Sequence, residues 1–222
     1  MHHHCEIIMP PTKDIGKAIE SIMHPFYEGQ EEPSGNEFYD FYVIGGRFAG
    51  TKETCGFAQE KMDEFYDALK EKKVTVSGLQ CGKQEIKPAS QIPMVDELWN
   101  GFFPTENGEI APCPMFAHSN NQYDSNDLLS CDICLVEEIP KTLKASRVII
   151  AGPTYDDAGI EATFMISDDF WNGVNHVKTI WDGNVLSALE MMKEKLGGYR
   201  EEYKEKIIPK SNWICITVDY HS

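Results

Sequence analysis

A glycine pair and an arginine, Gly45, Gly46 and Arg47, follow directly on an aromatic segment of this 222-residue chain. Glycines at a strand end permit positive φ angles, and their N–H groups beside a guanidinium can hold a phosphate or a carboxylate. Together with Asp40 and Tyr42 they are predicted to bind an anionic ligand. The alternative is a tight turn in which Arg47 pairs with a carboxylate such as Asp40. No GK[ST] sequence follows, so a P-loop is not indicated.

Asp219 and His221 form a second candidate site in the closing segment 212–222. Strand side chains alternate with period two, so both residues are expected on the same face. A carboxylate beside an imidazole can transfer protons or bind a metal. The alternative is a polar strand end with no chemical role.

Four residues have types and spacing that suit tetrahedral zinc, namely Cys113, His118, Cys131 and Cys134. The C-x-x-C pair, however, lies in a predicted strand, where positions three apart face opposite sides. We therefore predict no cofactor and keep a structural zinc as the alternative.

The chain has 36 acidic and 20 basic residues, a formal net charge of −16. Such a surface repels phosphates, which argues against general nucleic-acid binding. It suits docking on a basic partner, or solubility alone. No apolar run approaches the ~18 residues of a membrane span, and no signal segment is recognised, so a cytoplasmic protein with reduced thiols is predicted.

Hydrophobic periodicity predicts an α+β fold: a single domain, 1–222, with a mostly antiparallel sheet, flanking helices and a long loop-rich middle region. Between 74 and 130 we find no long periodic segment and expect an irregular insertion rich in proline and glycine. The last strand is apolar almost throughout, so it is expected to be central and covered on both faces. The predicted strands are 4–9, 38–44, 131–139, 146–152, 160–166 and 212–222, and the predicted helices are 15–22, 56–72 and 185–207, the last kinked or split at Gly197 and Gly198.

The segments "DFYVIGGRFAG" (40–50) and "ITVDYHS" (216–222) resemble a family of uncharacterised proteins encoded by phages, prophages and actinobacterial genomes. That family carries a D-aromatic-aromatic-x-I-G-G-R-aromatic segment and a C-terminal V-D-x-H strand, where Tyr220 stands in place of the usual cysteine. The resemblance implies a viral or mobile-element origin and no established reaction. The positions that match are Asp40, Gly45, Gly46, Arg47, Asp219 and His221.

The leading hypothesis is a phage-type binding protein of the bacterial host cytoplasm that interferes with a defence system. It would capture an anionic, nucleotide-like ligand near Arg47 or dock its acidic surface on a host protein. One alternative is an enzyme for a phosphate-bearing substrate, in which Arg47 holds the anion while His221 and Asp219 transfer protons. Another is a structural or virion-associated protein, and a homo-oligomer stays open.

Overall fold

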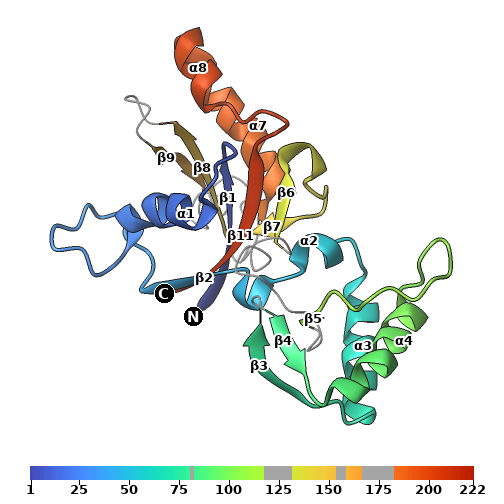
Figure 1. Cartoon of the computed structure of the whole chain (residues 1–222). Coiled ribbons are helices and arrows are strands. Elements are labelled where there is room, and N and C mark those ends of the chain that lie inside the picture. Colours follow the sequence, from blue (N-terminus) through green and yellow to red (C-terminus); the bar gives the residue numbers. More distant parts are fainter. Residues whose placement is uncertain (81–82, 118–131, 154–158, 167–182) are drawn as a thin grey trace.

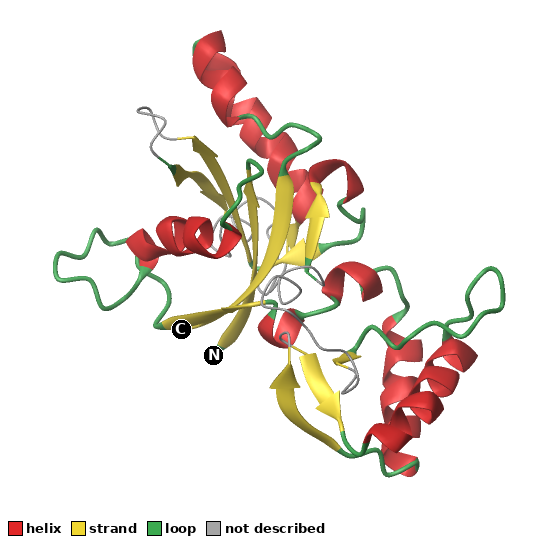
Figure 2. Ribbon diagram, in the orientation of Figure 1, coloured by secondary structure: helices red, strands yellow, loops and turns green. Residues whose placement is uncertain are grey.

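The computed structural model describes residues 1–80, 83–117, 132–153, 159–166 and 183–222. Its main sheet has the order β2-β11-β1-β8-β9, and β6 also pairs with β11 (Figures 1 and 2). Only the β1–β8 pairing is parallel within this sheet, so the predicted α+β fold with a mostly antiparallel sheet is confirmed. The strands are β1 (His2–Met9), β2 (Phe41–Ile44), β6 (Ile133–Leu135), β8 (Arg147–Pro153), β9 (Ile160–Ile166) and β11 (Ile214–His221).

Helices cover both faces of this sheet (Figure 1). Helix α1 (Ile15–Met23), capped by the Asp14 carboxylate, packs Ile19 and Ile22 on one face. On the other face lie α7 (Val185–Lys195), η5 (Leu196–Gly198) and α8 (Glu201–Ile207). The central, doubly covered last strand is therefore confirmed, and so is the split at the two glycines, which fall in η5.

The register of β1 and β11 brings a row of polar side chains onto one sheet face. His2 lies opposite His221, His4 opposite Asp219, and Glu6 opposite Thr217. The short helices η2 (Gly46–Phe48) and α2 (Thr51–Thr54) contact this row. A small second sheet pairs β7 (Lys144–Ala145) with β10 (Gly183–Asn184).

The middle of the chain is more regular than the sequence indicates. It contains α3 (Gln59–Glu71), η3 (Ala89–Gln91), α4 (Ile92–Phe102) and a three-stranded sheet of β3 (Val76–Gln80), β4 (Lys83–Ile86) and β5 (Phe116–Ala117). These elements share a separate hydrophobic core around Phe65 and Trp99. The expectation of no long periodic segment is wrong for 92–102: Ile92, Val95 and Trp99 recur at helical spacing, and Pro93 lies in the first turn, where proline is tolerated.

Most strand boundaries agree with prediction to within two residues, but two of the predicted strands are shorter in the structure. Strand β2 begins at Phe41 rather than 38, because the N–H groups of Phe38 and Tyr39 donate to the Phe26 carbonyl at the end of η1 (His24–Phe26) instead of to β11. The predicted strand 131–139 is a short β6 followed by the 3-10 helix η4 (Val136–Glu138). Within the ranges given above, no helix has the length and apolar character required to cross a bilayer.

Candidate functional site

The glycine turn after β2 holds one of the protein's own carboxylates. Gly45 and Gly46 have φ angles of 73° and 58°, and a Cβ on Gly46 would lie 2.3 Å from the Cβ of Asp219. The N–H of Gly45 donates to the Thr217 carbonyl (2.8 Å), and the N–H of Arg47 donates to Asp219 Oδ2 (2.9 Å). Both backbone donors are thus used inside the molecule.

A second internal carboxylate, that of Asp132, lies on the same turn. Its Oδ1 accepts from the Gly50 N–H at 2.9 Å, and its Oδ2 is 2.5 Å from where a Gly45 Cβ would be. The Arg47 side chain is exposed, and no described residue pairs with its guanidinium. Asp40 pairs with His221 rather than with Arg47. An external anion would therefore find the exposed guanidinium but not the N–H groups of Gly45 and Arg47.

The predicted Asp219 and His221 share a sheet face but have different partners. The Asp219 carboxylate, only 3% exposed, bonds His2 Nδ1 at 2.8 Å, whereas His221 Nδ1 bonds the Asp40 carboxylate at 2.9 Å. The two imidazole rings meet edge to face with centroids 5.3 Å apart. Desolvation by itself would raise the pKa of the Asp40 carboxyl, but the hydrogen bond and charge of His221, together with nearby backbone N–H groups, lower it. The result is two neighbouring His–Asp pairs, each able to exchange a proton.

A buried charged network adjoins these pairs on the same face, and sequence reasoning missed it. Glu6 is fully buried and bonds His4 Nε2 (2.8 Å), Lys52 Nζ (2.6 Å) and Thr217 Oγ1 (2.8 Å). Burial opposes the charge of Glu6, but the Lys52 ammonium and the His4 hydrogen bond outweigh it and lower the pKa of Glu6 to about 2. The sequence signal for this network was Glu6, a charged residue within the otherwise apolar segment "CEIIM" (5–9).

The cysteines proposed for zinc are not brought together by the described residues. Cys113 is buried in the core of the middle region, whereas Cys134 lies in β6 opposite Cys215. His118 and Cys131 fall outside the described residues. In the part of the chain that is described, no group of three or more His, Cys, Asp or Glu side chains is placed to hold a metal.

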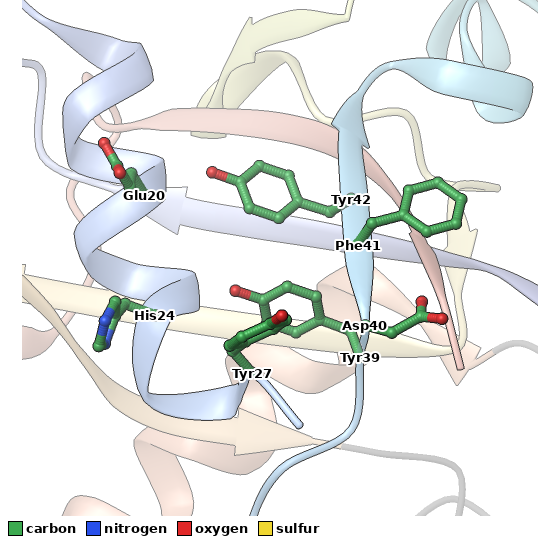
Figure 3. Close-up of a pocket in the computed structure, with 7 residues that line it drawn as sticks. All are labelled: Glu20, His24, Tyr27, Tyr39, Asp40, Phe41 and Tyr42. Carbon is green, nitrogen blue, oxygen red and sulfur yellow. The ribbon is translucent and has the colours of Figure 1, made fainter. Parts of the chain in front are cut away.

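An aromatic hollow of about 360 Å³ lies between α1 and β2 (Figure 3). Of the five residues predicted to bind a ligand, Asp40 and Tyr42 line it, whereas Gly45, Gly46 and Arg47 do not. Its other lining residues are Glu20, His24, Tyr27, Tyr39 and Phe41. The residues of the predicted site therefore lie in two separate places. One is the glycine turn, which is occupied by the carboxylates of Asp219 and Asp132, and the other is the hollow, which is open to a ligand.

Burial is the main reason that the pKa of Tyr39 is raised to about 12 and that the pKa of Tyr42 is also raised. The negative charge of Glu20 adds to both shifts. Both phenols therefore stay neutral at physiological pH. The rings of Tyr39 and Tyr42 thus add no charge to the hollow, and the carboxylates of its lining are those of Glu20 on α1 and Asp40 beside β2.

Comparison with protein-family models, with curated proteins and with solved structures finds no match.

Proposed function

We propose that this chain is a phage-type binding protein that docks an acidic surface on a basic protein of its bacterial host. It would work in the host cytoplasm as an inhibitor of a defence system. The observation that carries the docking is a continuous acidic stretch, residues 18–46, which contains no lysine or arginine. Its six acidic residues are Glu20, Glu28, Glu31, Glu32, Glu37 and Asp40.

This stretch is gathered on one part of the molecule. It runs from α1 through η1 and a polar loop into β2, and the Glu28 N–H donates to the Tyr39 carbonyl at 2.8 Å, which ties the start of the loop to the strand. Glu28, Glu31 and Glu32 are exposed. Clustered exposed carboxylates attract a positively charged surface and accelerate its association.

The same geometry favours docking over capture of an anionic nucleotide-like ligand. The N–H groups of Gly45 and Arg47 already donate to internal acceptors, and the carboxylates of Asp219 and Asp132 occupy the turn. An incoming phosphate would meet these two negative charges and a single exposed guanidinium. The proposal invokes no cofactor.

Fluorescence anisotropy with a labelled Arg-Ser repeat peptide tests the docking. The variant Glu28→Gln/Glu31→Gln/Glu32→Gln removes three charges from the acidic stretch. Its matched control, Glu60→Gln/Glu64→Gln/Glu71→Gln, removes three exposed charges from α3. We expect binding that weakens as salt is added and that is lost in the first variant only. Equal losses in both variants, or tighter binding of labelled ATP than of the peptide, would refute the docking.

The two His–Asp pairs support a second candidate, an enzyme for a phosphate-bearing substrate. Arg47 would hold the anion, while His221 and Asp219 would transfer protons. Each of these two residues has a hydrogen-bonded partner, Asp40 for His221 and His2 for Asp219. Phosphate release from nucleoside triphosphates and from a simple aryl phosphate measures this activity. Turnover that His221→Ala abolishes while the far-UV spectrum is unchanged would support the enzyme. Absence of turnover would exclude it for these substrates.

A further inference from the structure

We propose that the hollow between α1 and β2 receives the guanidinium group of an arginine side chain from the partner. This inference rests on the proposed docking function and names the chemical group that the docking surface recognises. The ligand class predicted from the sequence was an anion, whereas the hollow has the chemistry of a cation site.

Three tyrosines form the wall of the hollow. The ring centroids of Tyr27 and Tyr39 are 5.7 Å apart, and those of Tyr39 and Tyr42 are 5.6 Å apart with nearly perpendicular planes. Tyr39 is 5% exposed and Tyr27 is 40% exposed, so the cluster runs from the interior to the surface. Cations bind over the faces of such rings, where the aromatic quadrupole is negative.

A carboxylate, that of Glu20, lies on the helix side of the hollow, and its negative charge acts on Tyr39 and Tyr42. In Figure 3 the hydroxyl of Tyr42 on β2 points toward α1, which carries Glu20, and the Tyr39 and Tyr27 rings lie below. Asp40 and Phe41 also border the hollow, but their side chains point away from α1 (Figure 3). No lysine or arginine is among the lining residues. A positive charge in the hollow is thus attracted by Glu20, and no lysine or arginine side chain of the lining repels it.

The shape and size of the hollow suit arginine. A guanidinium is planar, stacks on aromatic faces and donates in a fork that matches a carboxylate, whereas the more strongly hydrated ammonium of lysine acts as a point charge. The volume of about 360 Å³ is at the lower end of the range for small-molecule pockets, which suits one inserted side chain. The surrounding acidic stretch would then attract the rest of the basic partner.

Titration calorimetry with two peptides of the same length tests this inference. One is an Arg-Ser repeat, and in the other citrulline replaces each arginine, which keeps the shape and removes the charge. Tyr27→Ala removes a partly exposed ring face, and Tyr27→Phe restores it. Tyr199→Ala is the matched control, because Tyr199 is 56% exposed and stacks on Tyr203 at the start of α8, away from the hollow.

We expect the arginine peptide to bind, the citrulline peptide to fail, and Tyr27→Ala to weaken binding about three- to tenfold. Tyr27→Phe and Tyr199→Ala should bind as the parent protein does. Glu20→Gln should also weaken binding, and Glu60→Gln should not. Spectra of each variant check that the fold is retained.

The two proposals fail in distinguishable ways. If the peptide still binds with its salt dependence while Tyr27→Ala and Glu20→Gln have no effect, the arginine site is wrong and the docking stands. If binding depends on Tyr27 and Glu20 but is unchanged in Glu28→Gln/Glu31→Gln/Glu32→Gln, the arginine site stands and the acidic docking surface is wrong. If neither peptide binds, both proposals are overturned.

Discussion

The backbone N–H of Arg47 donates a 2.9 Å hydrogen bond to the buried carboxylate of Asp219, although 172 residues separate the two in the chain. The glycine turn and the terminal Asp-x-His strand were two separate candidate sites in the sequence. In the folded protein they are one structural unit, because β2 pairs with the last four residues of β11. An internal carboxylate therefore occupies the turn that was predicted to hold an external anion.

Gly46→Ala tests this unit. The substitution places a Cβ 2.3 Å from the Asp219 Cβ at a residue with φ of 58°, so both a clash and backbone strain oppose it. We expect a loss of about 2–4 kcal/mol in the free energy of unfolding, measured by urea denaturation. The matched control is Gly101→Ala in α4, where a Cβ meets nothing within 4 Å and alanine should stabilise by up to about 1 kcal/mol. A loss under about 1 kcal/mol at Gly46 would contradict the geometry.

Lys52→Met tests the buried network. The Lys52 side chain is 6% exposed and pairs with the fully buried Glu6, so its removal leaves a buried negative charge with one partner fewer. We expect destabilisation of about 3–5 kcal/mol in urea denaturation. Lys61→Met, at an exposed lysine of α3, should change the free energy of unfolding by less than about 0.5 kcal/mol. In Lys52→Met/Glu6→Gln the loss should be smaller than the sum of the single losses, and strict additivity would argue against the pair.

The low pKa of Glu6 predicts a pH dependence of stability. Its folded-state pKa of about 2 lies below the ordinary 4.5, so the unfolded state binds the proton first as pH falls. The contribution of Glu6 is therefore fully present above about pH 5 and is lost as pH falls toward 2. Urea denaturation at a series of pH values should show a shallower acid decline in Glu6→Gln than in the parent protein. An unchanged decline would mean that Glu6 does not carry this dependence.

Cys134 is expected to be the most reactive of the described cysteines that lie in the main sheet. It is half-buried, and its hydrogen bond with the Cys215 thiol, supported by the charge of Lys52, outweighs burial and lowers the pKa of Cys134. Burial raises the pKa of Cys215 and of Cys5. Iodoacetamide should therefore alkylate Cys134 first, as followed by peptide mapping in a mass spectrometer.

Two controls accompany the alkylation. In denaturant the three thiols should react at similar rates, because their environments are lost. Lys52→Met should slow the reaction of Cys134 where its fold is retained. Alkylation of Cys215 as fast as that of Cys134 in the native protein would contradict the assignment.

Local sequence patterns were sufficient to predict much of the fold. The apolar run of 212–222 identified the central strand, the helical spacing of Ile15, Ile19 and Ile22 identified α1, and the two glycines at 197–198 marked the split between α7 and α8. Such patterns show which face of a helix or strand is buried, and they are formed by residues that are close together in the chain. The helix α4 was missed because Pro93 and Gly101 were interpreted as breaks, although proline is compatible with a first turn.

The sequence by itself determined the α+β class, the candidate residues and the acidic net charge. The tertiary structure alone decided their partners: His2 for Asp219, Asp40 for His221, and Lys52 for Glu6. It also decided that the glycine turn is filled and that the tyrosines enclose a hollow. The physical reason is that a partner is chosen by strand register and by packing between distant segments, and one residue of shift in a strand would move every side chain to the opposite face.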